Sequence, residues 1–273
     1  MTHTPTEVRA LLDRHGLEPR RALGQNFVAD PNTVRRIARL ADVGPGDAVV
    51  EVGAGLGSLT LALADTGAEV VAVEADPHLL PVLEEVLAGR GVRLVGGDAR
   101  RLAWDEVLAG RPRWSLVANL PYNVATPLVL DLLDDVPRID RYLVMVQREV
   151  GERLAAAPGT DAYGIPSVKV AYHAVAEVVG HVPPSVFVPR PRVDSVLVRL
   201  VRRDRPAVDA DPEVLFGLVR AAFGQRRKML RRSLAGRVDD AAFADAGIDP
   251  RDRPERLGIE AWGRLADVVA ARR

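Results

Sequence analysis

The stretch EVGAGLGSLT, residues 51–60, decides the fold of this chain. It starts within the apolar, β-rich run DAVVEV, and Gly53, Gly55 and Gly57 follow at alternate positions before a helical run begins. Glycines placed there let the backbone turn tightly between a strand and a helix and let a ligand approach it. Their G-x-G-x-G spacing departs from the G-x-G-x-x-G of dinucleotide-binding turns, which favours a nucleoside cofactor over a pyrophosphate one. Taken alone, the glycines would fit an ordinary strand-to-helix turn equally well.

Apolar β-rich runs alternate with amphipathic helical runs around this turn. The series reads DAVVEV, SLTLALADTG, AEVVAVEA, PHLLPVLEEVLAG, VRLVGGD, WSLVANL, TPLVLDLLDDV and RYLVMVQ. This alternation predicts a parallel sheet covered by helices. Asp30-Pro31 predicts a capped helix start just before the series, and AYHAVAEVVGHV and RVDSVLVRLVR predict antiparallel strands that close the sheet. The predicted fold class is therefore α/β, with a Rossmann-like sheet.

The pattern changes after Arg205-Pro206, where every periodic run is helical: PEVLFGLVRAAF, RRKMLRRSLAG, DDAAFADAG and EAWGRLADVVAAR. A chain of 273 residues is long enough for one large domain and a small one. We expect a Rossmann-like domain at residues 1–205 and a small all-helical domain at residues 206–273.

Composition excludes several classes of protein. Hydrophobic residues make up 48% and charged residues 27%, which is typical of a globular protein. The absence of cysteine excludes disulfides, thiolate zinc sites and a cysteine nucleophile, and it fits a reducing compartment. The five histidines have no metal-ligand spacing, so we expect no metal. No apolar run approaches the roughly 20 residues of a membrane span, and we expect a cytoplasmic protein that does not bind membranes.

Charge is balanced overall but uneven along the chain. The net charge is +0, which argues against bulk attraction to nucleic acid. Between Arg220 and Arg237, however, there are seven basic residues and no acidic one. In the helix predicted here, Arg227 and Arg231 are four residues apart. Their like charges would repel each other and mildly destabilise the helix unless an anion is bound. The predicted RNA-binding residues are Arg226, Arg227, Lys228 and Arg231; a solvated helix face is the alternative.

Two carboxylates follow later strands of the series. Glu74 ends the second strand in VVAVEAD, where it can accept hydrogen bonds from both ribose hydroxyls, and Asp98 ends the third strand, where it can accept from an adenine amino group. Each alone would be an ordinary solvated strand end. Together with the glycine turn they predict S-adenosylmethionine as the cofactor.

The motif NLPYN ends the fourth strand, at the carboxyl edge where α/β sheets bind ligands. A plain proline turn is the structural alternative. The lone pair of an adenine amino group is delocalised into the ring, so it must be localised before it can attack a methyl group. The side-chain oxygen of Asn119 and the backbone carbonyl of Leu120 can do this by accepting the amino hydrogens, while Pro121 stiffens the turn and Tyr122 offers a ring for stacking. No general base is required, because the methylated nitrogen becomes acidic.

Eight segments resemble the successive motifs of the ribosomal RNA adenine dimethyltransferases: RRALGQNFVAD, EVGAGLGSLT, VEAD, GGDA, NLPYNVATPL, QREVGERL, FVPRPRVDSV and FGQRRKMLRRSL. The resemblance spans nearly the whole chain and is to the KsgA/RsmA type. It implies N6,N6-dimethylation of two adjacent adenines in the 3′-terminal loop of 16S rRNA, within an assembling 30S subunit. We expect a monomer.

The resemblance also implies roles for individual residues. Asn26 and Val28 would contact the cofactor from an N-terminal segment that covers it, although members of the family commonly have Leu where Val28 stands. Phe187 would pack on the target base opposite Tyr122; judged without the resemblance, it would be a core residue. The resemblance assigns the remaining cofactor contacts to Gly53, Glu74, Asp98 and Asn119.

Three other functions fit part of the sequence. An Erm-type dimethyltransferase of 23S rRNA shares the glycine, NLPY and FxPxP motifs, but QREVGERL and FGQRRKMLRRSL favour the small-subunit type. A ribosome-assembly or transcription factor without turnover would not need the intact Asn119, Tyr122 and Glu74. A nicotinamide dehydrogenase would explain neither NLPY nor the basic run.

Overall fold

The chain folds into two compact units in the computed structural model, which describes residues 2–20, 23–121 and 124–272. The first unit comprises Met1–Gly151 and Glu177–Val201, and the second comprises Glu152–Ala176 and Arg202–Arg273. The second unit contains the predicted helical segment 206–273, and it also includes residues 152–176, which were predicted to belong to the Rossmann-like domain.

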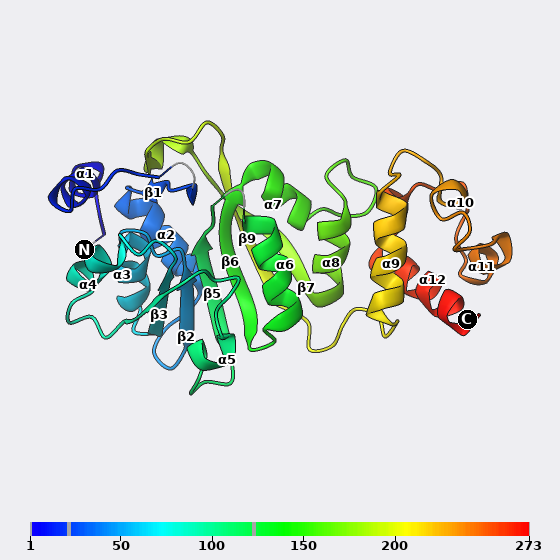
Figure 1. Cartoon of the computed structure of the whole chain (residues 1–273), viewed down its shortest axis with the longest axis horizontal. Coiled ribbons are helices and arrows are strands. Elements are labelled where there is room, and N and C mark those ends of the chain that lie inside the picture. The colour runs from blue at the N-terminus through cyan, green and yellow to red at the C-terminus, as the bar shows by residue number, and fades with distance from the viewer. Residues whose placement is uncertain (1, 21–22, 122–123, 273) are drawn as a thin grey trace. The chain divides into compact units, whose positions relative to one another are not determined.

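A seven-stranded sheet with the order β4-β3-β2-β5-β6-β9-β7 is the central element of the first unit (Figure 1). Strands β2 to β6 pair in parallel, and β9 pairs antiparallel with β6. The strand order reverses at β2, and the carboxyl edge beside such a reversal is where ligands bind in open α/β sheets. The predicted α/β class with a Rossmann-like sheet is confirmed. The strands are β2 (Ala48–Val52), β3 (Glu69–Glu74), β4 (Arg93–Gly96), β5 (Trp114–Asn119), β6 (Ile139–Gln147), β7 (Ala174–Val182) and β9 (Ser195–Arg202).

A separate two-stranded sheet joins the N-terminal segment to the loop before β9. Strand β1 (Phe27–Val28) pairs antiparallel with β8 (Phe187–Val188), and the register sets Val28 opposite Phe187. This pairing fixes the segment that precedes β1.

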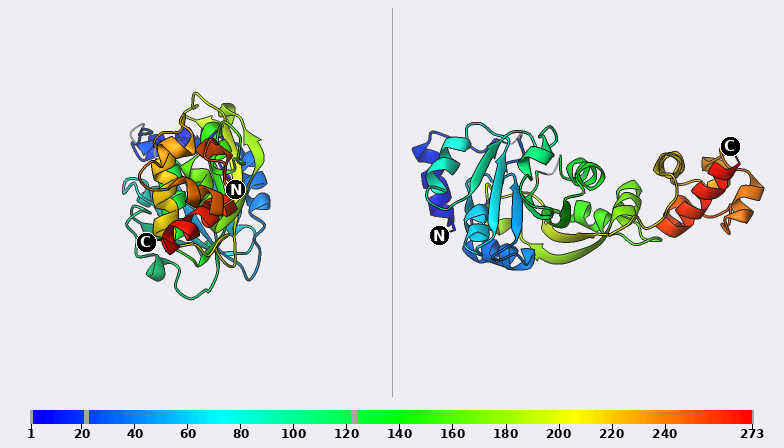
Figure 2. Two further views of the ribbon diagram at one scale, coloured as in Figure 1. Left: turned by 90° about the vertical axis from the view of Figure 1, so that its right-hand side faces the viewer. Right: turned by 90° about the horizontal axis from the view of Figure 1, so that it is seen from below.

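Helices cover both faces of the large sheet, with α2 and α6 on opposite faces (Figure 1 and Figure 2). Apolar residues of α2 recur at helical spacing, so Val34, Ile37, Ala38 and Ala41 form one buried face. The carboxylate of Asp30 accepts a hydrogen bond from the backbone N–H of Thr33 at 2.8 Å, which confirms the predicted cap. The helices are α1 (Pro5–Arg14), α2 (Pro31–Ala41), α3 (Ser58–Ala64), α4 (Leu80–Val86), α5 (Trp104–Val107), α6 (Ala125–Asp135) and α7 (Arg148–Leu154), the last of which runs into the second unit.

The second unit is helical and has its own apolar core. Trp262, Phe243 and Leu215 are at most 1% exposed and belong to one cluster. The hydroxyl of Tyr163 donates to the backbone carbonyl of Leu257 at 2.9 Å and ties residues before α8 to this core. The helices are α8 (Ile165–His173), α9 (Pro212–Phe223), α10 (Leu230–Ser233), α11 (Asp240–Asp245) and α12 (Ile259–Ala271). Across both units, no helix within the described residues is long and apolar enough to cross a membrane.

The prediction of one helix through the basic run is wrong. Helix α9 ends at Phe223, residues 224–228 form turns and a bend, and α10 begins only at Leu230. The reason is tertiary: the backbone N–H of Leu230 donates to Asp252 O at 2.7 Å, and that of Arg231 donates to Pro250 O at 2.9 Å, in place of bonds within a helix. The argument from like charges four residues apart therefore does not apply to this run.

Candidate active site

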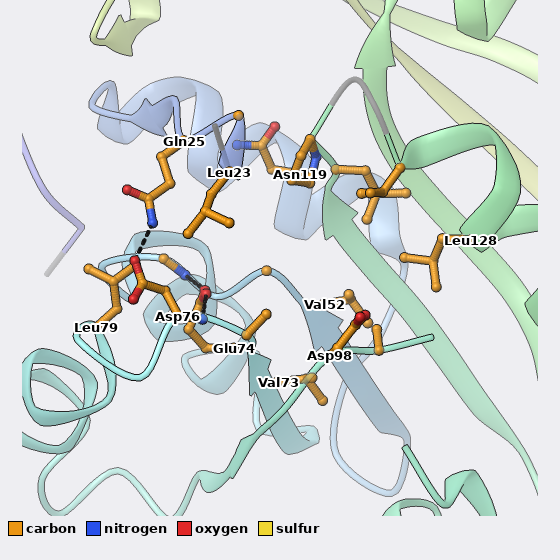
Figure 3. Close-up of a pocket in the computed structure, with 18 of the residues that line it drawn as sticks. Leu23, Gln25, Val52, Val73, Glu74, Asp76, Leu79, Asp98, Asn119 and Leu128 are labelled. Carbon is orange, nitrogen blue, oxygen red and sulfur yellow. Dashed lines mark hydrogen bonds between the residues drawn. The ribbon is translucent and has the colours of Figure 1, made fainter. Parts of the chain in front are cut away.

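A cavity of about 240 Å³ opens at the carboxyl edge of β2, β3, β4 and β5 (Figure 3). Residues of the N-terminal segment complete its wall. The sequence-predicted residues that line it are Asn26, Gly53, Gly55, Glu74, Asp98, Asn119, Leu120 and Pro121. The strand ends thus meet at one place, as parallel strands require.

The glycine turn presents bare backbone to this cavity. Gly53 has a φ of 79° and Gly55 a φ of 60°, a region that residues with side chains rarely adopt. A Cβ on Gly55 would lie 3.1 Å from the ring of Phe27, and one on Gly53 would lie 3.4 Å from the carbonyl oxygen of Asn119. Both glycines line the cavity, so a ligand there meets main chain without side chains at these two positions.

Glu74 is a buried carboxylate at the end of β3, with only 7% of its surface exposed. Its Oε2 accepts from the backbone N–H of Gly55 and its Oε1 from that of Asp76, both at 2.8 Å. Burial raises the pKa of Glu74, while these two hydrogen bonds oppose the rise. Each carboxylate oxygen has two acceptor positions, so both oxygens keep one for ligand hydroxyls.

Asp98 follows β4 and is more open than Glu74. Its Oδ1 accepts from the backbone N–H of Arg100 at 3.0 Å, and its side chain is 55% exposed. The turn therefore orients a carboxylate that borders both the cavity and solvent.

Asn119 has a fixed side-chain orientation. Its Nδ2 donates to the backbone carbonyl of Asn26 at 3.0 Å, so Oδ1 is the acceptor that remains, and no described residue donates to it. The backbone N–H of Leu120 donates to Met145 O at 3.1 Å and ties the motif to β6. The carbonyl of Pro121 accepts from the first turn of α6, which holds the other end of the motif.

Two predicted site residues of the first unit, Val28 and Phe187, are not among those that line the cavity. Val28 and Phe187 are 6% and 4% exposed and pack in an apolar cluster with Leu197. In this structure Phe187 is a core side chain, so its contact with a target base stays a prediction. Tyr122 lies outside the described residues.

The predicted RNA-binding residues lie in the second unit, and they differ in whether their side chains contact other residues of the protein. Arg226 serves the fold, because its Nη2 donates to Asp161 O at 2.7 Å and its Nε lies 4.0 Å from a carboxylate oxygen of Glu255. The side chains of Arg227, Lys228 and Arg231 are exposed, and none of the three makes a hydrogen bond or an ion pair with the part of the chain that the structure describes. Among the predicted RNA-binding residues, these three are therefore available to an anion, although the charge of Arg231 also acts on Asp249.

Sequence reasoning missed several residues that line the cavity, among them Leu23, Gln25, Asp76, Leu79 and Leu128. The two polar ones stand beside predicted residues, since Gln25 precedes Asn26 and Asp76 follows Glu74 by two positions. Their positions next to predicted site residues in the sequence are the signal by which Gln25 and Asp76 could have been predicted. The leucines carry no chemical signal that separates them from core residues.

Glu51, inside the glycine motif, is fully enclosed. It is 1% exposed, and its Oε2 has no hydrogen-bond partner within the described residues. Burial raises the pKa of Glu51 to about 8, with a further contribution from the charge of Glu74. This pKa favours the protonated form of Glu51 at neutral pH. Over the same described ranges, no group of three or more His, Asp or Glu side chains is arranged to hold a metal ion.

Comparison with known proteins decides the family. The family model described as ribosomal RNA adenine dimethylase matches residues 16–271. The chain belongs to this family. The membership predicted from the sequence motifs is thereby confirmed.

Curated relatives of this dimethylase include proteins named ribosomal RNA small subunit methyltransferase A. The relative from Kineococcus radiotolerans is 52% identical over 95% of this chain and 89% of its own length. The relative from Thermobifida fusca is 50% identical over 97% of this chain and 95% of its own length.

Solved structures share the fold of the dimethylase. The 23S rRNA methyltransferase ErmE is 26% identical, with a TM-score of 0.68, and the match covers 90% of this chain and 100% of that one. A dimethyladenosine transferase from Plasmodium falciparum is 22% identical, with a TM-score of 0.71 over 86% of this chain and 94% of that one. The second likeness shows the fold alone.

Methyl transfer in this family depends on S-adenosylmethionine, and the cavity of this dimethylase fits that molecule. Buried Glu74 and half-open Asp98 offer acceptors for hydroxyl and amino groups. Gly53 and Gly55 line the cavity with main chain that carries no side chain.

Proposed function

We propose that this protein dimethylates the N6 amino groups of two adjacent adenines in the 3′-terminal loop of 16S rRNA, within an assembling small subunit. The observation that carries the choice of subunit is the 52% identity to a small subunit methyltransferase A over 95% of the chain. The likeness to the large-subunit enzyme ErmE is only 26%. A protein with this substrate acts where ribosomes are assembled, in the cytoplasm.

The residues proposed to hold S-adenosylmethionine line one cavity, apart from Val28. Glu74 accepts from the ribose hydroxyls, Asp98 accepts from the adenine amino group, and the backbone at Gly53 and Gly55 allows close approach. Asn26 belongs to the wall that closes over the cofactor. When bound, the cofactor supplies an electrophilic methyl group on a sulfonium.

Asn119 prepares the target amine. Because Nδ2 is engaged by Asn26, the side chain offers Oδ1 to one amino hydrogen, and the backbone carbonyl of Leu120 offers a second acceptor. Accepting both hydrogens draws the nitrogen lone pair out of conjugation with the adenine ring. The contribution of the protein is mainly positioning, which can supply roughly 7 to 11 kcal/mol of barrier reduction.

The target base must leave its RNA stack to reach this cavity. Tyr122 and Phe187 are proposed to stack on its two faces, and base–aromatic stacking contributes roughly 1 to 3 kcal/mol per base. Since Phe187 is buried against Val28 in this structure, a stacking role requires its ring to shift out of the cluster when RNA binds.

RNA capture is assigned to the second unit. Arg227, Lys228 and Arg231 are exposed cations within a stretch free of acidic residues. A protein with net charge +0 needs such a local concentration to bind folded rRNA.

Incubation with S-adenosylmethionine and ribosomal subunits tests the proposal. The subunits come from cells that lack both the 16S and the 23S dimethyladenines. Nucleoside mass spectrometry of each rRNA should show two dimethyladenines in 16S and none in 23S. Dimethyladenine in 23S alone would establish the Erm-type activity instead. No product with either subunit, despite binding to one of them, would indicate an assembly factor without turnover.

A further inference from the structure

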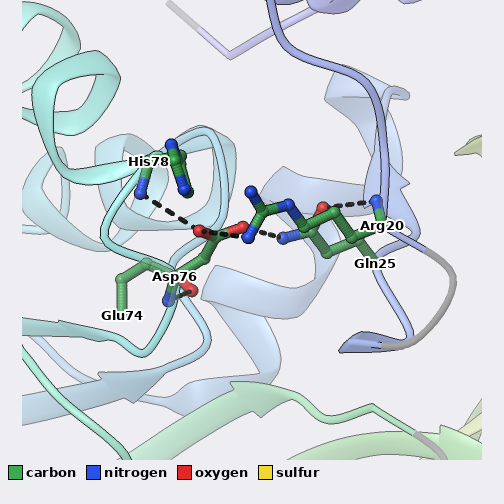
Figure 4. Close-up of polar contacts among 5 residues, drawn as sticks. All are labelled: Arg20, Gln25, Glu74, Asp76 and His78. Atoms are coloured by element: carbon green, nitrogen blue, oxygen red, sulfur yellow. Dashed lines mark hydrogen bonds and ion pairs between the residues drawn. The ribbon is translucent and has the colours of Figure 1, made fainter.

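Asp76 is the centre of a buried polar network that the mechanism above does not use (Figure 4). The residue is only 3% exposed. Its carboxylate accepts from Gln25 Nε2 at 2.8 Å, from the backbone N–H of His78 at 3.1 Å and from Arg20 Nη1 at 3.4 Å. Its own backbone N–H donates to Glu74 Oε1 at 2.8 Å. The network therefore ends on the carboxylate proposed to hold the ribose.

Gln25 is bound at both ends of its amide. Oε1 accepts from the backbone N–H of Arg20 at 2.8 Å, and Nε2 donates to Asp76 Oδ2 at 2.8 Å. The two hydrogen bonds have opposite polarity, so a carboxylate at position 25 could keep the first but not the second while Asp76 is ionised. This amide connects the N-terminal segment to the turn after β3, 51 residues further along the chain.

Both sides of the connection line the cavity. On one side are residues 23–26, which we term the N-terminal wall, and on the other are Glu74 and Asp76. The wall also reaches the target side of the cavity, because the carbonyl of Asn26 accepts the hydrogen bond that orients Asn119.

We propose that Gln25 and Asp76 are positioning residues that hold the N-terminal wall against the turn after β3 and so limit how fast S-adenosylmethionine and S-adenosylhomocysteine leave the cavity. The proposal rests on the proposed function, since it takes this cavity as the cofactor site. A buried carboxylate is stable only when donors meet its charge, and the side-chain donors to Asp76 come from Gln25 and Arg20 of the N-terminal segment. Detaching the wall therefore also leaves Asp76 short of donors next to buried Glu74.

The first test is Gln25→Glu, which sets two carboxylates against each other. S-adenosylhomocysteine should dissociate roughly tenfold faster or more in stopped-flow measurements, since a hydrogen bond to a charged group contributes at least that factor. The KM for S-adenosylmethionine should rise by a similar factor. The kcat at saturating cofactor should change less, because Asn26, whose carbonyl orients Asn119, directly precedes β1 and is also held by the pairing of β1 with β8.

The decisive test is the double variant Gln25→Glu with Asp76→Asn, which reverses the polarity of the pair. The carboxylate at position 25 then accepts from the backbone N–H of Arg20 and from the new amide at position 76, whose oxygen still accepts from His78. The dissociation rate of S-adenosylhomocysteine should return toward the wild-type value. If the two substitutions caused independent structural defects, their effects on the dissociation rate would add instead of cancelling.

Matched controls separate the possible failures. Gln225→Glu introduces the same charge change at an exposed position of the second unit and should leave dissociation unchanged. If Gln25→Glu does not fold, as judged by its melting temperature without cofactor, Gln25→Ala replaces it and should also release S-adenosylhomocysteine faster. Wild-type protein that does not bind S-adenosylhomocysteine would refute the proposed function. Wild-type binding with unchanged dissociation in the position 25 variants, or a double variant that is no slower than Gln25→Glu, would overturn this inference alone.

Discussion

The side-chain amide of Asn119 donates to the backbone carbonyl of Asn26 at 3.0 Å, although the two residues are 93 positions apart in the chain. This bond fixes which end of the amide faces the cavity. In the proposed mechanism a carboxamide is needed at position 119, because it donates to Asn26 O and accepts from the target amine at the same time.

Substitutions at Asn119 test this double role. Asn119→Ala should lower the single-turnover rate roughly a hundredfold or more, the loss of about 2.7 to 4 kcal/mol expected for one preorganised polar contact. Binding of RNA should change little. Asn119→Asp should be nearly as slow, because a carboxylate cannot donate to Asn26 O, although it retains acceptors. Near wild-type methylation by either variant would exclude the amine-localising mechanism.

Glu74→Gln should raise the dissociation constant for S-adenosylmethionine roughly tenfold or more, since charge-assisted hydrogen bonds of about 1.5 to 3 kcal/mol become neutral ones. Because burial raises the pKa of Glu74, its carboxylate takes up a proton at a higher pH than an ordinary Glu. The affinity of the wild type should therefore fall as the pH is lowered through this range, while that of Glu74→Gln stays flatter. Calorimetry at several pH values measures both, and parallel pH profiles would remove Glu74 from the ribose site.

The location of the site was predictable because it follows from strand ends. Glu74, Asp98 and Asn119 each end or follow a run with clear β character, and parallel strands bring such ends to one edge. The hydrogen bonds of Gln25 to Asp76 and of Asn119 to Asn26 were not predictable, because they join polar residues whose separation in sequence carries no periodicity.

The basic run shows the limit of local patterns. Its sequence has helical spacing, but the hydrogen bond from Leu230 N–H to Asp252 O decides where α10 begins. That bond depends on how the loop around Asp252 packs. For the same reason residues 152–176, whose helix α8 packs on α9, belong with the second unit although the sequence places them before the last strands.

Phe187→Ala should lower the free energy of unfolding by about 3 to 5 kcal/mol, the usual cost of removing a buried aromatic ring. The ring is 4% exposed and packs with Val28 across the small sheet. Denaturant unfolding measures the loss. Phe187→Leu keeps more of the apolar volume and should lose methylation rate without a comparable loss of stability if the ring also stacks on the base. An alanine variant as stable as the wild type would show that the ring is not part of the core.

Replacing Arg227, Lys228 and Arg231 together with alanine should weaken binding to the small subunit and leave cofactor affinity intact. Each lost phosphate contact should reduce the slope of log affinity against log salt by roughly 0.7 to 1. Arg226→Ala is the matched variant, because its guanidinium is held by Asp161 and Glu255. It should lower the melting temperature of the second unit, and it should reduce the salt slope less than the triple variant does. Equal slopes for the triple variant and the wild type would mean that RNA binds at another surface, for which Arg190, Arg192 and Arg20 are the next candidates.

Glu51→Gln should make the stability of the protein less dependent on pH. The pKa of Glu51 is raised from 4.5 to about 8, so the folded state holds this proton more tightly than the unfolded state does. The contribution of Glu51 is therefore fully present below about pH 4.5 and is lost as the pH rises, by about 1.4 kcal/mol per pH unit, until the folded pKa near 8 is passed.

Glutamine mimics the protonated form at every pH, so the variant should gain on the wild type between pH 5 and pH 8, as the difference in unfolding free energy grows with roughly the slope given by linkage. Denaturant unfolding without cofactor, at several pH values for both proteins, measures this difference. Glu84→Gln, at an exposed position, is the control and should show no such trend. A constant difference between the wild type and Glu51→Gln across this range would mean that Glu51 is ionised in the fold, and that its buried Oε2 has a partner such as an ordered water.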